Sequence, residues 1–341
     1  MRIRKGAKSR QTTQLRMRVV YLFGAGATHA ELANICEDRI SDAGFLEKNS
    51  LLLASVSKRV CIAAKRDHDF TPKIRSLLSS TGLSNIELFI SLLEDNHVPS
   101  ASDIVQKLKA KLKKDILGRL RHRQERFYLH KALFEFHRMN KEEDLTGVIS
   151  LNYDGLIDEA YELITGRKPN YCFSQDSSKD DSIPILKLHG GFDLKYREKK
   201  LPILAPGVNK NYLELPYSFV WGRALELLLD CDILRIVGCS LSQNDLGIVD
   251  LLFKAHIKRN NPPLLQIIDF DPENNRIREH FGFFPKVERA LEIEGNLISD
   301  VAIRDPFKSS NPFKIWLKAK IERVMKVAEI EKTTYVKKIL K

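Results

Sequence analysis

Two short apolar runs that end abruptly in polar residues and glycine constrain this chain most. The first, Val148–Gly155, has the sequence VISLNYDG, and the second, Ile185–Gly191, has the sequence ILKLHGG. Buried parallel strands have this pattern where they deliver side chains to the carboxyl edge of a sheet. In open α/β sheets that edge is where ligands bind. The two runs therefore predict a ligand site that contains Asn152, Asp154 and His189.

The length and composition are those of a folded protein with one large core, or with one core and a smaller appended domain. The chain has 341 residues, of which 43% are hydrophobic and 29% are charged. It contains no apolar run of about 18 residues, so we expect no membrane span. The five cysteines are scattered and form no Cys-x-x-Cys pair, which argues against a disulfide framework and against a zinc site. With a basic N-terminus that lacks an apolar signal region, this predicts a cytoplasmic protein.

The net charge of +12, from 56 basic and 44 acidic residues, raises the question of a polyanionic partner. The excess is spread over predicted helices and the two ends of the chain rather than gathered in one aromatic-rich patch. That distribution favours solvated helix faces, and direct contact with nucleic acid is the less favoured alternative. Residues 1–18 carry seven Lys and Arg and no acid. We expect this basic arm to become ordered on a partner.

The next run, Arg18–Phe23, is strand-like and leads directly into the loop Gly24–Thr28, of sequence GAGAT. A glycine pair after a buried strand lets the backbone turn tightly and approach a phosphate, and a following helix offers free N–H groups. The dinucleotide fingerprint requires a third glycine, where this chain has His29. Taken alone, the loop is also consistent with a simple turn.

Strand patterns are missing between about residues 43 and 140, where apolar residues recur at helical spacing. The segment from Asp103 to Met139 is rich in lysine, which is typical of an amphipathic helix with a lysine face. Strand and helix patterns then alternate as far as Asp271, as expected for a mostly parallel sheet with right-handed crossovers. Candidate strands are Val148–Leu151, Ile185–Leu188, Ile203–Leu204, Ile233–Val237 and Leu264–Asp269, with helices at Tyr217–Leu229 and Asp245–Lys258.

The sequence therefore predicts an α/β, Rossmann-like domain over residues 19–290 that carries a large helical insertion at about 43–140. Residues 291–341 are expected to form a C-terminal tail that ends in an amphipathic helix, Phe313–Lys341. Such a terminal helix usually docks on its own domain, although it is also a common way to reach a partner subunit.

Five predicted strands end in small or functional residues. These ends are Gly24–Thr28, Asn152–Asp154, His189–Gly191, Gly238–Ser240 and Asp269–Asp271. In order and spacing they resemble the sirtuin family, and specifically its zinc-free, SIR2-like branch from bacterial anti-phage defence proteins. The resemblance extends from about Val19 to Asp271, apart from the helical insertion.

Four loops carry the resemblance. Sirtuins open with a Gly-Ala-Gly-Ala-Ser loop, which is similar to Gly24–Thr28, and their Gln-Asn-Ile-Asp segment is matched at Asn152 and Asp154. Their Leu-His-Gly segment is similar to Leu188–Gly190, and their Gly-Thr/Ser-Ser loop is similar to Gly238–Ser240. The stretch Leu204–Lys210 also looks like a loop of the SIR2-like defence proteins.

The departures from the family pattern are informative. The two Cys-x-x-Cys pairs of the deacylases are absent, Leu151 replaces the glutamine, and Glu31–Cys36 stands where sirtuins have Pro-Asp-Phe-Arg. Together these differences argue against protein deacylation. The resemblance then implies a sirtuin-type fold that hydrolyses NAD+ as its substrate and needs no zinc.

The chemistry of NAD+ cleavage, together with the resemblance, gives each site residue an expected role. His189 is the expected catalytic base, accepting a proton from water or a ribose hydroxyl, and the Asn152 amide holds the water or the ribose. Asp154 is expected to orient these groups. The pyrophosphate is expected at Gly24, Ala25, Gly26 and Thr28. The adenosine side of NAD+ is expected at Gly238 and Ser240. Asp269 stands where many sirtuins have asparagine, and its place at the end of the last apolar strand is what assigns it to an adenosine ribose hydroxyl.

Purely structural roles are the alternative. His189 would then be a core histidine bonded to backbone, and Asn152 and Asp154 would cap the helix that follows them. The joint occurrence of the five strand ends favours the nucleotide site.

The expected function is cleavage of the nicotinamide–ribose bond, which depletes NAD+ in abortive infection. The competing hypothesis is a catalytically silent subunit that binds NAD+ or ADP-ribose. A residual deacylase would need a peptide groove, for which the sequence gives no sign. Because the predicted domains leave little room for a large sensor, we expect a homo-oligomer or a separately encoded activator. A HerA-like ATPase/helicase is the partner that the resemblance suggests, ahead of a short Argonaute-type protein.

Overall fold

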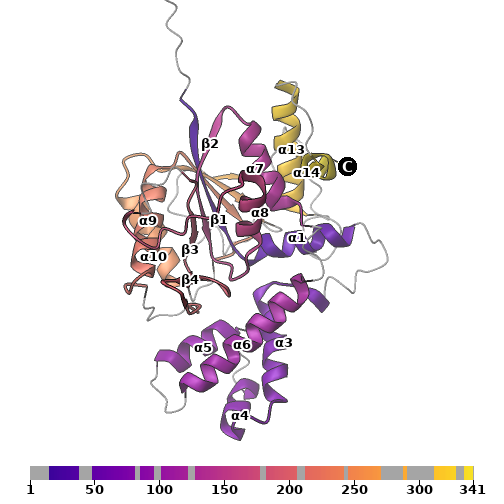
Figure 1. Cartoon of the computed structure of the whole chain (residues 1–341), viewed down its shortest axis with the longest axis vertical. Helices are drawn as coiled ribbons and strands as arrows, with labels where there is room; N and C mark the ends of the chain where they lie inside the picture. The colour runs from indigo at the N-terminus through magenta and orange to yellow at the C-terminus, as the bar shows by residue number, and fades with distance from the viewer. Residues whose placement is uncertain are drawn as a thin grey trace, which may run out of the picture.

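Six strands form the central sheet in the computed structural model of the chain (Figure 1). The strands are β1 (Met17–Phe23), β2 (Glu143–Ser150), β3 (Ile185–Lys187), β6 (Ile233–Val237), β7 (Leu264–Ile268) and β8 (Val287–Arg289). The structure describes residues 15–37, 48–80, 85–95, 101–121, 127–176, 182–205, 212–241, 245–269, 287–289, 311–327 and 334–340.

The strand order across the sheet is β3-β2-β1-β6-β7-β8, and every neighbouring pair is parallel. The chain runs outward from β1 to β3 on one side and then returns to place β6 on the other side of β1. This is the doubly wound order of Rossmann folds, whose direction reverses between the first and fourth strands of the sheet. The predicted α/β, Rossmann-like fold with a mostly parallel sheet is confirmed.

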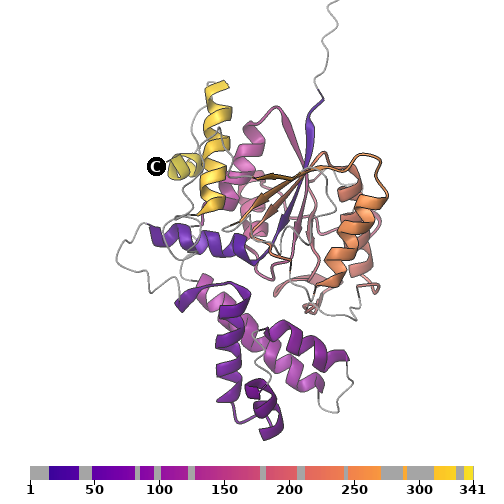
Figure 2. The ribbon, with the colours of Figure 1, turned by 180° about the vertical axis from the view of Figure 1, so that it is seen from behind.

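Helices cover both faces of the sheet, as Figure 1 and the reverse view in Figure 2 show. Successive side chains of β1 point to opposite faces. Val19, Tyr21 and Phe23 pack against helices of one layer, and Val20 and Leu22 pack against helices of the other. The first layer contains α1 (Ala25–Glu37), α7 (Leu129–Met139), α8 (Leu156–Thr165), α13 (Pro312–Val327) and α14 (Thr334–Leu340). The second layer contains α9 (Tyr217–Asp230) and α10 (Leu246–Ile257).

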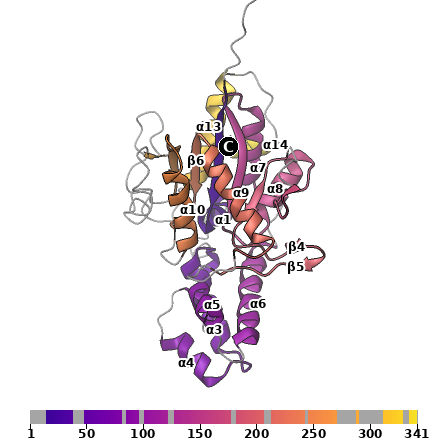
Figure 3. The ribbon, with the colours of Figure 1, turned by 90° about the vertical axis from the view of Figure 1, so that its left-hand side faces the viewer.

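Four further helices form a separate body, called the helical module here. They are α3 (Leu53–Lys65), α4 (Pro72–Ser80), α5 (Ile86–Asp95) and α6 (Ala101–Leu120). Their apolar sides share a core with Tyr153, Phe192 and Ile203, which lie in the loops that follow β2 and β3. The module therefore packs against loops at the carboxyl edge of the sheet, and Figure 3 shows it below the strands.

Four of the five lysines of α6 form ion pairs with neighbouring carboxylates. Lys109 bridges Glu94 at 2.6 Å and donates to the Ile203 carbonyl at 2.9 Å. Lys113 bridges Asp193 at 2.6 Å, in the loop after β3. Because two of these bonds reach loops of the sheet, α6 ties the helical module to the carboxyl edge.

Helix α7 differs from the sequence prediction, which placed it inside the insertion. The lysine-rich segment from Asp103 to Met139 divides into α6 and α7, and α7 packs on the sheet with Leu133 and Phe136 fully buried. Apolar residues on several sides of α7 bury it between the sheet, α8 and α13. Helical spacing alone does not distinguish such a helix from one in a separate body.

Short elements also differ from the prediction. Ile203–Leu204 lies outside the sheet, where the Leu204 N–H donates to the His189 carbonyl at 2.9 Å. The hairpin of β4 (Lys195–Tyr196) and β5 (Lys199–Lys200) was not predicted, because two polar residues per strand give no apolar alternation. The parallel edge strand β8 lies in a region that was interpreted as the end of the domain.

The C-terminal segment docks on its own domain. Trp316 and Ile321 of α13 are buried in the core next to α7, and the Asn311 amide donates to the Ala30 carbonyl at 2.6 Å. The predicted single helix, Phe313–Lys341, is described as α13 and α14. Residues 1–14 of the basic arm lie outside the described residues. Within the described ranges, no helix is long and apolar enough to cross a membrane.

A buried ion pair joins the strands beneath α13. The Arg235 guanidinium on β6 is fully buried and donates to both Glu143 carboxylate oxygens, at 2.6 and 2.7 Å. It also donates to the Tyr21 hydroxyl at 2.9 Å and to Gln266 at 2.7 Å, and it lies over the Trp316 ring. Burial alone would raise the pKa of the Glu143 carboxyl, but the bonds from Arg235 lower it below its ordinary value.

We predict that Arg235→Met destabilises the fold by about 3–5 kcal/mol, because it leaves a largely buried carboxylate without its cation. Urea unfolding followed by circular dichroism measures this change. Arg223→Met is the matched control, since Arg223 pairs with Glu226 on the surface of α9 and should change the free energy of unfolding by less than about 1 kcal/mol. Equal effects of the two substitutions would contradict the role assigned to Arg235.

Candidate functional site

The loops that follow β1 and β6 meet at the point where the strand order reverses. The Gly24 N–H donates to the Val237 carbonyl at 3.0 Å, and the Gly26 N–H donates to the Gly238 carbonyl at 2.8 Å. A Cβ atom on Gly26 would lie 2.6 Å from the Gly238 Cα, and Gly238 has a φ of +58°. Contact between the two backbones therefore requires glycine here, independently of any ligand.

Helix α1 begins directly after Gly24, so the predicted phosphate loop is short. Ala25 is exposed at the N-terminus of α1, whereas Thr28 is buried one turn later. The Gly26 N–H, one of the groups expected to bind a phosphate, is occupied by the Gly238 carbonyl. The pyrophosphate role of this loop stays a prediction.

A hydrogen-bonded network connects the β1 loop to the β2 loop. The Asn152 side-chain amide donates to the Gly24 carbonyl at 2.9 Å and to the Thr28 hydroxyl at 3.0 Å. The Thr28 hydroxyl donates to the Asp154 carboxylate at 2.8 Å. Asp154 also accepts from the Leu156 N–H at 3.1 Å, near the start of α8. The capping alternative therefore applies to Asp154, while Asn152 joins the two loops.

The imidazole of His189 binds a carboxylate. His189 Nε2 lies 2.9 Å from Asp245 Oδ2, and both side chains are 4% exposed. Asp245 occupies the N-cap position of α10 but makes no capping hydrogen bond with its side chain. An N-cap aspartate ordinarily bonds to its own helix; here the carboxylate is directed at His189.

Sequence reasoning missed Asp245 because an Asp before a helical pattern is the ordinary sign of a cap. Tyr153 was missed as well: it lies between Asn152 and Asp154, and its ring centroid is 6.3 Å from that of His189. Burial, and next the Glu87 carboxylate of the helical module, raise the pKa of the Tyr153 phenol well above its usual value. The phenol therefore stays protonated beside the imidazole.

The residues expected on the adenosine side lie at the ends of β6 and β7. Ser240 is exposed, and Asp269 is half-buried at the carboxyl end of β7. Cys239, the residue before Ser240, is buried, and burial raises the pKa of its thiol to about 12 with a further contribution from Asp245 and Asp269. The thiol is therefore protonated at neutral pH and is not a nucleophile.

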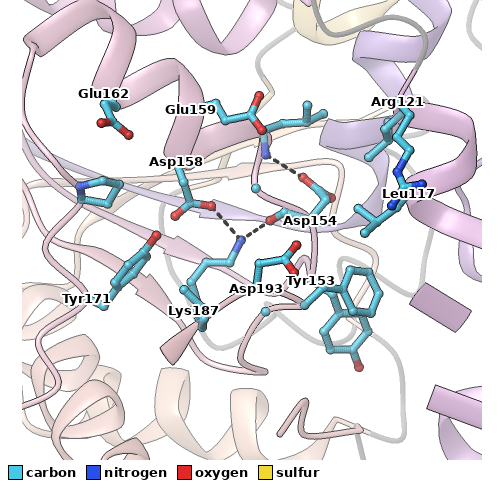
Figure 4. Close-up of a pocket in the computed structure, with 17 residues that line it drawn as sticks. Leu117, Arg121, Tyr153, Asp154, Asp158, Glu159, Glu162, Tyr171, Lys187 and Asp193 are labelled. Carbon is cyan, nitrogen blue, oxygen red and sulfur yellow. Dashed lines mark hydrogen bonds and ion pairs between the residues drawn. The ribbon is translucent and has the colours of Figure 1, made fainter. Parts of the chain in front are cut away.

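A cavity of about 340 Å³ opens beside the Asn152 network (Figure 4). It lies between the loops after β2 and β3, helix α8 and the end of α6, and Asp154 belongs both to its wall and to the network. Lys187, only 1% exposed, donates to the Asp154 carbonyl and pairs with Asp158 at 3.3 Å. Sequence reasoning also missed this buried charge, although a lysine within the apolar run 185–188 could have indicated it.

Within the described part of the chain, no group of three or more His, Cys, Asp and Glu side chains is placed to hold a metal ion. Compared with known proteins, the chain matches no family model, and no curated protein matches it.

The contact between glycines predicts the effect of adding one methyl group. In Gly238→Ala the new Cβ would lie 2.2 Å from the Ala27 nitrogen, so we expect a loss of about 2–4 kcal/mol from the clash and the left-handed backbone. Gly118→Ala is the control, because Gly118 lies inside α6 with nothing within 4 Å of the added atom. It should stabilise the chain by about 0.5–1 kcal/mol. Thermal unfolding of both variants tests the contact, and a neutral Gly238→Ala would refute it.

A second prediction concerns His29, which is fully buried and accepts from the Leu51 N–H at 3.4 Å. Burial lowers its pKa from 6.5 to about 4. Between these values the unfolded chain binds a proton that the folded chain does not, so stability falls as the pH decreases from about 6.5 to about 4. The loss due to His29 is about 2 kcal/mol at pH 5.

His29→Asn keeps an acceptor for Leu51 but does not titrate in this range. Urea unfolding at pH 7 and pH 5 should therefore show a drop that is smaller by about 2 kcal/mol in this variant. Carboxylates elsewhere contribute equally to both proteins and cancel. An identical drop in both would show that His29 is not held neutral by burial.

Proposed function

We propose that this protein is an NAD+ hydrolase that cleaves the nicotinamide–ribose bond to give nicotinamide and ADP-ribose. The observation that carries the proposal is the His189–Asp245 pair, which is buried at the carboxyl edge of a doubly wound sheet. A histidine oriented by a carboxylate is a suitable general base. The crevice beyond the carboxyl edge, where the strand order reverses, is where such sheets bind dinucleotides.

Binding of the dinucleotide is assigned to the loops that flank the reversal. Gly24, Ala25, Gly26 and Thr28 would lie along the pyrophosphate, with the exposed N-terminus of α1 contributing positive potential. On the adenosine side, Gly238 and Ser240 would contact the phosphate and ribose, and Asp269 would accept from a ribose hydroxyl.

The chemistry needs little acid assistance, because the leaving nicotinamide is already cationic in NAD+. Water attacks C1′ of the ribose, the bonding electron pair of the C1′–N bond leaves with nicotinamide, and the proton of the water passes to His189. With Nε2 directed at Asp245, Nδ1 is the nitrogen that accepts this proton. The carboxylate stabilises the imidazolium that forms.

The role of Asn152 follows from its hydrogen bonds. Both of its amide hydrogens are engaged, by the Gly24 carbonyl and the Thr28 hydroxyl. Its side-chain carbonyl oxygen is therefore the group that would accept from the attacking water or a ribose hydroxyl. Asp154 holds Thr28 and thereby orients this network.

In the described conformation His189 is 3% and Asn152 is 9% exposed. The helical module packs on the loops beside them through Tyr153 and Phe192, so NAD+ would enter only after the module or the loops move. A closed resting state fits an enzyme that depletes cellular NAD+ in anti-phage defence and must be triggered. We place the trigger in self-assembly or in a separately encoded partner, of which a HerA-like ATPase is the leading candidate.

The burial of both catalytic candidates also favours one competing function. A subunit that binds NAD+ or ADP-ribose without turnover needs no access of water to His189. Such a protein would show binding by calorimetry and release no nicotinamide.

The deciding experiment measures nicotinamide release from NAD+ by the purified chain, after light scattering has established its assembly state. We expect His189→Ala, Asn152→Ala and Asp245→Asn each to lower the turnover number by at least about 100-fold. Asp245→Asn should leave KM within about threefold, because Asp245 acts through the histidine rather than on the substrate. His68→Ala, at an exposed position in the helical module, is the control and should have wild-type activity.

If NAD+ binds measurably but stays intact in every assembly state, the hydrolase proposal is rejected in favour of the catalytically silent subunit. Full activity of Asp245→Asn would instead remove the His189–Asp245 pair from the mechanism.

A further inference from the structure

The helical module joins the rest of the domain at the carboxyl end of α6. Leu120, the last residue of α6, shares an apolar cluster with Leu32 of α1 and Leu156 of α8. Leu51, just before α3, and Phe127, between α6 and α7, belong to the same cluster. The chain therefore enters and leaves the module where the module packs on the domain, and this cluster is called the pivot here. A body attached in this way is able to rotate about its point of attachment.

Two lysines farther along α6 bind the segment that follows β3. At 1.5 Å per residue, Lys109 lies about 16 Å from the pivot along the helix. Its ammonium group donates to the Ile203 carbonyl at 2.9 Å. Lys113, one turn closer to the pivot, pairs with Asp193 at 2.6 Å and donates to the Phe192 carbonyl at 3.3 Å. The bonds from these two lysines to the segment after β3 are called the latch here.

The segment that the latch binds also holds His189. The Leu204 N–H, next to Ile203, donates to the His189 carbonyl at 2.9 Å, and the Phe192 N–H donates to the Tyr153 carbonyl at 3.0 Å. The Tyr153 ring centroid lies 6.3 Å from that of His189 and 5.5 Å from that of Phe192. Tyr153 and Phe192 belong to the apolar core of the module. The position of the module is therefore linked to the burial of His189.

The charges of the latch are more exposed than the buried ion pair of Arg235. The Asp193 side chain is 76% exposed, and that of Lys113 is 29% exposed. Lys109 also pairs with Glu94 of α5, whose side chain is 39% exposed. Ion pairs between exposed side chains are weak and are screened by salt. The latch is therefore a contact that opens more easily than the strands of the sheet separate.

We propose that the helical module is an autoinhibitory lid over the NAD+ site, held closed by the latch of Lys109 and Lys113. Breaking the latch lets the module rotate about the pivot and uncovers Asn152 and His189, so that NAD+ enters. This consequence rests on the proposed function, whereas the latch itself is a property of the fold. An activator of the enzyme then acts by stabilising the open position of the module.

Hydrogen–deuterium exchange of the full chain tests the latch without reference to activity. In the double variant Lys109→Met and Lys113→Met, peptides that contain the Phe192 and Leu204 amides should exchange at least about tenfold faster than in the wild type. Methionine keeps a long apolar side chain and removes only the charge and its bonds. Added salt should accelerate this exchange in the wild type and have a smaller effect in the variant.

The matched control is the double variant Lys107→Met and Lys111→Met. It removes the same two charges from the same helix, but Lys107 and Lys111 pair with Asp69 and Asp67 inside the module. Its Phe192 and Leu204 peptides should exchange as in the wild type. Circular dichroism first establishes that both variants are folded. If the latch variant does not fold, Asp193→Asn decides the question, since it breaks one latch bond at an exposed position and should accelerate exchange about threefold.

Nicotinamide release and NAD+ binding by calorimetry provide the second measurement. The latch variant should release nicotinamide, or bind NAD+, at least about tenfold better than the wild type and the control variant. Unchanged exchange in the latch variant, or an equal increase in the control, would overturn the latch whatever the activity. Faster exchange with unchanged release and binding would overturn the lid. Tighter NAD+ binding without nicotinamide release from any variant would support the lid and reject the hydrolase.

Discussion

The contact between the loops after β1 and β6 is the constraint on which the site depends. Gly26 donates to the Gly238 carbonyl, and neither residue has room for a side chain. β1 and β6 are neighbours in the sheet but far apart in the sequence, and the whole helical module is inserted between them. Their close approach fixes the start of α1 beside the end of β6. This contact therefore fixes the positions of the loops where the strand order reverses, and Thr28 and Asn152 lie next to them.

Two clusters at the carboxyl edge have different physical characters. Hydrogen bonds among Asn152, Thr28 and Asp154 hold the β1 and β2 loops together, and Asp154 is the one ionisable side chain of the three. His189 and Asp245 form a buried acid–base pair between the β3 and β6 loops. The first cluster is suited to holding a ligand in place and the second to moving a proton. Tyr153 lies beside both and packs into the core of the helical module, so movement of the module would affect the two clusters together.

Away from the carboxyl edge, the strands of the sheet are held together by interactions that do not involve the residues of the candidate site. Arg235 joins β1, β2, β6 and β7 through Tyr21, Glu143 and Gln266, and it lies against Trp316 of α13. A buried guanidinium with all these partners permits little relative movement of the strands. The carboxyl edge, in contrast, is covered by the helical module through two lysine contacts and an apolar core. The rigid part of the domain is therefore the strand cluster around Arg235, whereas the contacts that could open lie between the helical module and the carboxyl edge.

The sequence by itself determined the parallel α/β sheet, the positions of five of its strands and the polar residues at their ends. These follow from apolar runs that stop at polar residues and glycine, which is a local property of the chain. Only the tertiary structure decided which groups those residues meet. It paired His189 with Asp245, which in sequence resembles a helix cap, and it engaged both hydrogens of the Asn152 amide. It also placed α7 on the sheet and formed the acidic cavity beside Asp154. Local patterns record how deeply a residue is buried, whereas its partner depends on where distant loops come together.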